Sequence, residues 1–184
     1  MLAASTDGRL LDVFPRRRLD ELVAEHCGVH RQRLFSPAVT VGLFVEQVTS
    51  ADPACQDVVG RYLSQRTALD LGANGLGTGS YCKARQRLPL ALIEACAMEV
   101  ATLAAAALPS VARWRGREIK LIDGTGVSMP DTVELQAAFP QSRSQAPGLG
   151  FPQARIVGVV SLSSGCVSHW RMTPCQGKGT GESS

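Results

Sequence analysis

The sequence predicts an α+β fold, with helices in the N-terminal part of the chain and strands in the C-terminal part. Apolar residues recur at helical spacing from about Leu10 to Leu108, whereas from Arg117 onward they alternate or run continuously, as they do in β-strands. The chain has 184 residues and is 45% hydrophobic, which is enough to build the core of one or two domains. We therefore expect two regions, a helical one over residues 1–112 and a strand-containing one over residues 113–184.

Capping residues predict where the first helices begin. The pair Ser36-Pro37 is expected to open a helix that continues through Val48, because Ser is a good N-cap and Pro suits the first helical turn. The pair Asp52-Pro53 is expected to open the next helix in the same way. Apolar spacing predicts that one stripe of this second helix is buried, formed by Val58, Val59, Tyr62 and Leu63.

A short basic helix is expected to begin near Gly79, after a glycine-rich loop. Its apolar side is predicted to consist of Tyr81, Ala84 and Leu88. Lys83 and Arg87 are four residues apart and fall nearly opposite that side. This spacing has two interpretations. The basic side contacts DNA phosphates, since clustered Lys and Arg supply the salt-dependent part of DNA affinity, or it is an ordinary solvated face.

An alanine-rich helix is expected between Pro89 and Pro109. Its apolar run contains Glu94 and Glu99, so it is not predicted to cross a membrane. The first twelve residues contain three charged side chains, where a secretory signal needs an uninterrupted apolar region. We therefore expect a soluble cytoplasmic protein without a membrane partner.

The cysteines and histidines predict neither disulfides nor a zinc site. Six cysteines are scattered along the chain without a CxxC pair, and we expect free, mostly buried thiols at positions 27, 55, 82, 96, 166 and 175. His26 and His30 are expected to lie on one face of a surface helix. Two histidines without a CxxC pair are too few ligands for a tetrahedral zinc site.

Three strands are expected in the C-terminal region. Arg117 to Asp123 alternates, Ala154 to Leu162 is β-branched and nearly continuously apolar, and Cys166 to Met172 alternates again. The turn Ser163-Ser164-Gly165 predicts that the last two strands form a hairpin. The thirty residues Gly124 to Gln153 are expected to form a loop, and a loop of that length is usually functional or disordered.

Asp123 is expected at the end of the first strand, directly before Gly124. One interpretation is structural, because Asp before Gly is a common turn signal. The other is a Mg²⁺ ligand, because a carboxylate that faces a crevice supplies the oxygen that this cation prefers. Asp123 shares strand parity with Ile119 and Leu121. Metal-assisted phosphodiester chemistry requires two or three such acids to converge.

Three stretches of the chain resemble the type-four family of DDE-class transposases of bacterial insertion sequences. They are SADPACQDVVGRYLSQR, TGSYCKARQRLP and LIDGTGVSMPDTVELQAAFPQSRSQAPGLGFPQARIVGVVSLSSG. The resemblance extends from about Val39 to Glu182. It implies a helical DNA-binding region followed by a ribonuclease-H-like catalytic domain, whose first three strands form an antiparallel meander. The function that it implies is DNA transposition, in which transposon ends are cut and joined with Mg²⁺.

The resemblance also implies roles for individual residues. Asp123 matches the first catalytic aspartate, which is a ligand shared by two Mg²⁺ ions. Lys83, Arg85 and Arg87 match the family's basic helix and are expected to contact double-stranded DNA at the transposon ends.

The family requires a second aspartate and a glutamate that this chain does not match. The acidic residues after Asp123 are Asp131, Glu134 and Glu182. None of them corresponds to a missing acid, so we expect a truncated ribonuclease-H-like domain with a weak or absent metal site. Enzymatic activity of the chain by itself stays open. The alternative function is that of a catalytically dead DNA-binding remnant or an inhibitor of transposition. The oligomeric state also stays open, with a homo-oligomer among the alternatives.

Overall fold

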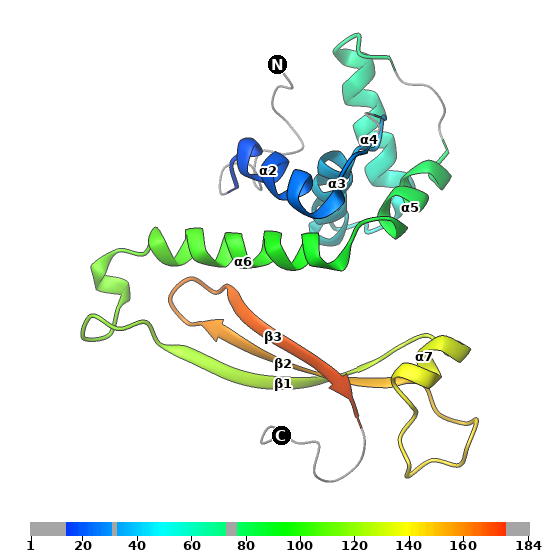
Figure 1. Ribbon diagram of the computed structural model, residues 1–184, viewed down its shortest axis with the longest axis vertical. Coiled ribbons are helices and arrows are strands. Elements are labelled where there is room, and N and C mark those ends of the chain that lie inside the picture. The colour runs from blue at the N-terminus through cyan, green and yellow to red at the C-terminus, as the bar shows by residue number, and fades with distance from the viewer. Residues whose placement is uncertain (1–13, 31–32, 73–76, 176–184) are drawn as a thin grey trace. The chain divides into compact units, whose positions relative to one another are not determined.

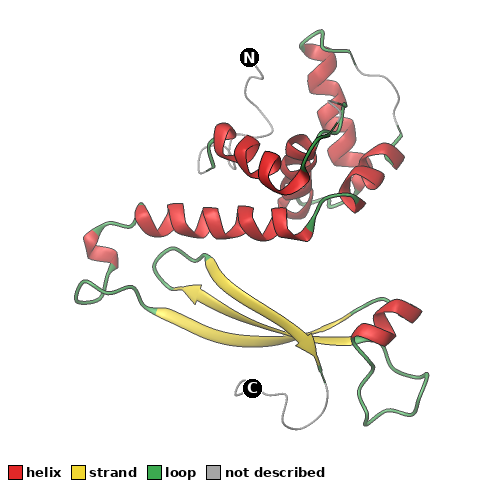
Figure 2. Cartoon of the chain, in the orientation of Figure 1, coloured by secondary structure: helices red, strands yellow, loops and turns green. Residues whose placement is uncertain are grey.

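The computed structural model describes residues 14–30, 33–72 and 77–175 (Figure 1). These residues form six α-helices, one 3-10 helix and one three-stranded antiparallel sheet, as the α+β prediction requires (Figure 2). The chain divides into two compact units, Met1–Val100 and Ala101–Ser184. The division falls inside the alanine-rich helix.

Among the described residues, five α-helices precede the sheet. They are α2 (Arg16–Cys27), α3 (Pro37–Thr49), α4 (Cys55–Ala68), α5 (Gly79–Gln86) and α6 (Leu90–Ala106). The prediction for α3 is confirmed, because Pro37 is its first residue and the Ser36 hydroxyl accepts a hydrogen bond from the Val39 backbone N–H at 3.5 Å. The start predicted for the alanine-rich helix is also confirmed, since α6 begins directly after Pro89.

Two details of the helical prediction are wrong. Helix α4 begins at Cys55, two residues after the predicted pair, and the Asp52 carboxylate instead accepts a hydrogen bond from the Ala54 backbone N–H at 2.9 Å. Helix α2 ends at Cys27, because Gly28 adopts a positive φ of 58° and turns the chain away. His30 therefore lies beyond the helix and does not share a helical face with His26.

The core of the first unit is formed by α3, α4 and α5. Its buried residues are Leu43 from α3, Val58, Val59 and Leu63 from α4, and Tyr81 from α5. The predicted stripe of α4 is thus buried, except that Tyr62 is only partly covered. Phe35 packs between the two tyrosines, with its ring centroid 5.9 Å from Tyr62 and 5.7 Å from Tyr81.

None of the described helices is by itself long and apolar enough to cross a membrane. Helices α5 and α6 meet that length and composition requirement only as a pair, and they are bent by 82° at their junction.

The second unit contains an antiparallel meander. Its strands are β1 (Lys120–Ser128), β2 (Gln153–Ser161) and β3 (Val167–Pro174), in the order β1-β2-β3. The short 3-10 helix η1 (Ser110–Ala112) precedes them. The predicted β2–β3 hairpin is confirmed, and Gly165 adopts a positive φ of 70° in its turn.

The prediction that the first strand ends at Asp123 is wrong. Strand β1 continues for five residues beyond it, because Gly124 and Gly126 pair with Val157 and Arg155 of β2. Pairing with a neighbouring strand stabilises extended backbone that these glycines would not favour locally.

The long connection between β1 and β2 is shorter and more ordered than predicted. It contains α7 (Val133–Ala138), which is capped by the Thr132 hydroxyl accepting from the Leu135 N–H at 3.2 Å. The Gln141 side chain holds the rest of the loop together. Its amide oxygen accepts from the N–H groups of Gly148 and Gly150, and its amide nitrogen donates to the Ala146 carbonyl at 2.8 Å.

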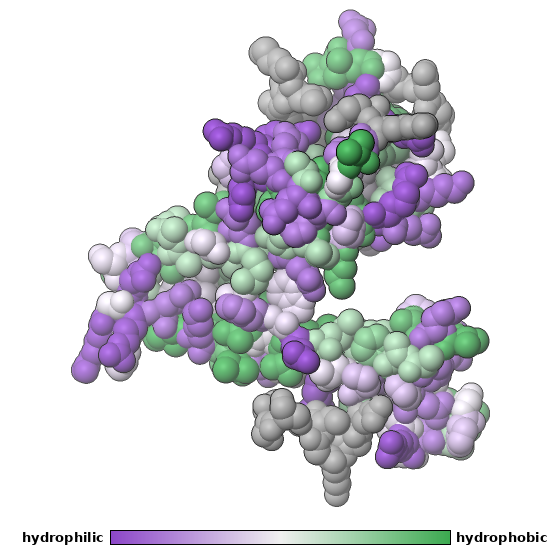
Figure 3. All heavy atoms as spheres, in the orientation of Figure 1, coloured by the Kyte–Doolittle hydropathy of each residue, from purple (hydrophilic) through white to green (hydrophobic). Residues whose placement is uncertain are grey.

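Large apolar side chains are exposed on the meander, as the hydropathy colours over this unit illustrate (Figure 3). Strand alternation assigns them to both faces of the sheet. They are Leu121, Ile122, Val127, Val167, Trp170 and Met172.

All six cysteines are free thiols, and each is partly exposed. The expectation that most of them are buried is therefore wrong.

Candidate functional site

Helix α5 has one buried side and one exposed basic side. Tyr81 and Ala84 are buried in the core, whereas Lys83 and Arg87 are exposed. Within the described ranges, the side chains of Lys83 and Arg87 form no hydrogen bond or ion pair with another residue. Two positive charges, one on α5 and one at its C-cap, are thus available to an external anion.

Arg85 is placed differently from the other two basic residues. Its guanidinium is partly buried and donates a hydrogen bond to the side-chain oxygen of Gln47 at 3.0 Å. The guanidinium also lies 5.0 Å from the ring centroid of Phe44 and 5.8 Å from that of Tyr81. Through these contacts Arg85 helps to pack α5 against α3. The sequence pattern of α5 did not indicate this role.

Gln47 links three elements of the helical unit. Its side-chain oxygen also accepts from the Tyr81 hydroxyl at 2.9 Å, and its side-chain nitrogen donates to the Pro53 carbonyl at 2.6 Å. Burial raises the pKa of Tyr81 to about 12, and the nearby charge of Arg85 opposes part of this increase.

A hollow of about 330 Å³ lies beside Arg87. Arg87 follows α5, and the residues lining the hollow also include His30 and Arg33 from the connection between α2 and α3. Apolar residues contribute to the lining as well, among them Phe35 and Leu88. No sequence pattern indicates His30 and Arg33 as site residues, because none connects them with a helix more than forty residues away.

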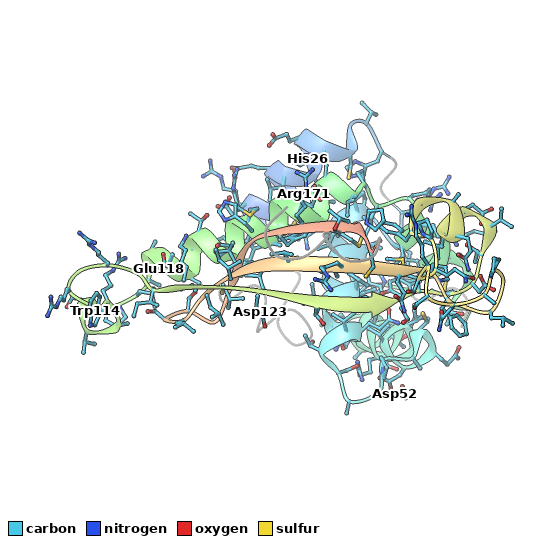
Figure 4. The ribbon with its side chains drawn as sticks, turned by 90° about the horizontal axis from the view of Figure 1, so that it is seen from below. His26, Asp52, Trp114, Glu118, Asp123 and Arg171 are labelled. Atoms are coloured by element: carbon cyan, nitrogen blue, oxygen red, sulfur yellow. The ribbon has the colours of Figure 1, made fainter. Side chains whose placement is uncertain are left out.

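Asp123 lies in the middle of β1, as labelled in Figure 4. The register places Gly158 of β2 opposite it, and Trp170 of β3 opposite Gly158. Asp123 is exposed, and its carboxylate accepts a hydrogen bond from the Gly124 N–H at 2.8 Å. Because side chains alternate along a strand, Asp123 shares its face of the sheet with Leu121 and Thr125.

No second acid accompanies Asp123 on its face of the described sheet. Asp131 accepts a hydrogen bond from the Gln136 side chain at 2.8 Å, and Glu134 lies in the first turn of α7. Glu182 lies outside the described residues. Over residues 14–30, 33–72 and 77–175, no three His, Cys, Asp or Glu side chains are grouped so that they could hold a metal ion.

The opposite face of the sheet carries basic residues among apolar ones. By strand alternation and register it carries Arg155 on β2 and both His169 and Arg171 on β3. Arg155 pairs with Thr173 and Arg171 pairs with Val157, so the two arginines are diagonal neighbours. The alternation of side chains along a strand could have indicated that these arginines share a face, but they were not among the predicted site residues.

Comparison of the chain with models of protein families, with curated proteins and with solved structures gives no match.

Proposed function

We propose that this chain acts in DNA transposition by binding double-stranded DNA at the ends of an insertion sequence. The observation that carries the proposal is the exposed pair formed by Lys83 on α5 and Arg87 at its C-cap. Two unpaired cations at helical spacing are suited to neighbouring phosphates on a DNA backbone. The resemblance of TGSYCKARQRLP to the basic helix of DDE-class transposases supports the same assignment.

The second unit supports a ribonuclease-H-like assignment. An antiparallel meander with an aspartate on its first strand is what the transposase resemblance implies, and β1 carries Asp123 in such a meander. In this proposal Asp123 is the first acid of a DDE site.

The described residues do not fit a Mg²⁺ site by themselves. Mg²⁺ dehydrates reluctantly and binds weakly to a single carboxylate, and Asp123 is the one acid on its face of the sheet among the described residues. Two-metal phosphodiester chemistry requires further acids beside it. We therefore assign no catalytic step to this set of residues.

The isolation of Asp123 favours a second candidate function. A chain that occupies transposon ends without cutting them would compete with an active transposase and inhibit transposition. The two candidates differ in one assay. Mg²⁺-dependent nicking of a transposon-end duplex by the 184-residue chain, abolished in Asp123→Asn, would establish the enzyme; DNA binding without nicking would favour the inhibitor.

DNA binding is tested by the salt dependence of affinity. Each lost phosphate contact lowers the slope of log K against log salt by about 0.9. We expect the double variant Lys83→Ala/Arg87→Ala to bind duplex DNA with a slope smaller by roughly one to two units. The measurement is a fluorescence anisotropy titration with a labelled duplex at several salt concentrations.

Arg16 and Arg17 provide a matched control on another helix of the same unit. Arg17 is exposed and Arg16 is partly exposed, but they form ion pairs with Glu21 and Asp20 at 3.0 and 3.1 Å, so their charges are locally compensated. The double variant Arg16→Ala/Arg17→Ala should keep the wild-type slope. If both double variants retain that slope, α5 does not contact the DNA.

A further inference from the structure

The hollow beside Arg87 is formed by two segments that are far apart in the sequence. Arg33 lies in the connection between α2 and α3, and Arg87 directly follows α5. The hollow has a volume of about 330 Å³, which is large enough for a phosphate group and its neighbouring sugar. Tertiary packing thus brings two arginines to one concave surface.

The positive charge in this hollow is not compensated by the described part of the protein. Arg33 and Arg87 are exposed, and neither side chain forms an ion pair or hydrogen bond with another described residue. Among the described residues that line the hollow, none is Asp or Glu. A guanidinium stays protonated at any physiological pH, so two of them beside one cavity repel each other unless an anion lies between them.

The rest of the lining, as far as the structure describes it, is largely apolar. Phe35, Leu88 and Pro89 contribute carbon surface, and the buried Thr40 hydroxyl already donates to the Ser36 carbonyl at 2.8 Å. His30 also lines the hollow, with its Nδ1 3.1 Å from the Gly28 carbonyl. A ligand that matches this surface has a phosphate for the arginines and carbon atoms beside it, as a nucleic-acid backbone has.

We propose that the hollow binds a backbone phosphate of the DNA duplex, with Arg33 and Arg87 donating hydrogen bonds to the same phosphate from two sides. The planar guanidinium fork matches the phosphate oxygens, and apolar residues of the lining contact the adjacent sugar. This inference rests on the proposed function and adds a second segment to the DNA interface. The interface is then a clamp formed by Arg87 at the C-cap of α5 and Arg33 before α3.

The first test is a double-mutant cycle of Arg33→Ala and Arg87→Ala in the 184-residue chain. Arg33→Ala should lower the salt slope of duplex binding by about one unit, as expected when one cation that faces a phosphate is removed. Because both arginines bind the same phosphate, adding Arg33→Ala to Arg87→Ala should cost less affinity than Arg33→Ala costs in the wild type. Arg33→Gln provides a second variant that keeps hydrogen-bonding capacity without charge, and it should show the same loss of slope.

Arg17→Ala is the single-residue control, because the Arg17 side chain is 91% exposed in the same unit but lies outside the hollow and pairs with Glu21. It should bind like the wild type. If Arg33→Ala and Arg33→Gln also bind like the wild type while Lys83→Ala/Arg87→Ala loses slope, the clamp is wrong and the proposed function stands. If no variant and no wild-type chain binds duplex DNA, the proposed function fails together with the clamp.

The second test uses Cys27, whose thiol lines the same hollow. Duplex DNA should protect Cys27 from alkylation while leaving Cys166 of the other unit reactive, as read by peptide mass spectrometry. The same assay with inorganic phosphate distinguishes the two sources of the anion. Protection by duplex DNA at concentrations where inorganic phosphate gives none supports the clamp. Protection by inorganic phosphate with none by DNA, or no protection by either, overturns it.

Discussion

Tyr81 and Gln47 show how one buried hydrogen bond determines what a neighbouring charge can do. The Gln47 side-chain oxygen accepts from both Tyr81 and Arg85, at 2.9 and 3.0 Å. Arg85 is therefore held against the core, although it stands between Lys83 and Arg87 in the sequence. A basic residue between two exposed basic residues can thus serve packing, because a buried amide oxygen stabilises its charge.

The titration of Tyr81 is a prediction that concerns a single residue. Its pKa is raised from 10.0 to about 12 because burial disfavours the charged phenolate. The folded state therefore keeps its proton longer than the unfolded state. The stability that this contributes is fully present below about pH 10 and is lost as pH rises toward 12. In Tyr62→Phe, Tyr81 is the only tyrosine, and phenolate absorbance at 295 nm should rise with a midpoint near pH 12.

Tyr81→Phe is the complementary variant. Its free energy of unfolding should be about 1 kcal/mol lower at neutral pH, because the hydrogen bond to Gln47 is lost. Between pH 10 and 12 this free energy should fall less steeply than that of the wild type. A phenolate midpoint near pH 10 in folded Tyr62→Phe would show that Tyr81 is accessible to solvent.

Helix α4 illustrates how a whole element is held in place. Val58, Val59 and Leu63 are buried on one side of it, and they pack with Leu43 of α3 and Tyr81 of α5. Its N-cap residue, Ala54, has no side chain that could satisfy the first backbone N–H groups. The stability of α4 therefore depends mainly on its buried stripe.

Leu63→Ala tests this dependence. Removing a buried leucine side chain should lower the free energy of unfolding by roughly 2–5 kcal/mol, through lost burial and the cavity left behind. Leu69 is a matched control, because it directly follows α4 and is 47% exposed. Leu69→Ala should change stability by no more than about 0.5 kcal/mol. Urea unfolding followed by far-ultraviolet circular dichroism measures both, and equal losses would mean that the stripe does not anchor α4.

The whole molecule combines a helical unit that buries its own core with a sheet unit that exposes apolar surface. Strands β1 and β3 each pair only with β2 among the described residues, so each has an outer edge without a partner strand. Leu121, Ile122 and Trp170 are exposed on this sheet. Exposed edges and apolar faces promote association between chains.

We therefore expect the chain to self-associate through its sheet, and Ile122→Lys to reduce this association. Ile122 is 67% exposed, so the new charge disrupts intermolecular packing and removes little from the protein's own core. Val111→Lys is the control, because Val111 is 89% exposed in η1, outside the sheet. Sedimentation velocity over a concentration series reports both. A reduction of equal size in the two variants would mean that added charge alone, and not the sheet, controls association.

The sequence by itself determined the features that depend on neighbouring residues. The start of α3 follows from the Ser36 cap and Pro37, and the β2–β3 hairpin follows from two strand patterns joined by a turn at Gly165. The two sides of α5 follow from helical spacing. In each case the deciding interactions span only a few residues, so the local pattern contains the required information.

Only the tertiary structure decided the features that depend on distant segments. Asp123 lies inside β1 because β2 pairs with the residues on both sides of it, which overrides the turn tendency of Asp before Gly. Arg85 turns toward the core because Gln47 of α3 accepts its hydrogen bond. Arg33 and Arg87 line one hollow because the residues before α3 and the end of α5 come together when the chain folds. These outcomes depend on which segments come into contact after folding. The residue pattern of one segment carries no information about such contacts with distant segments.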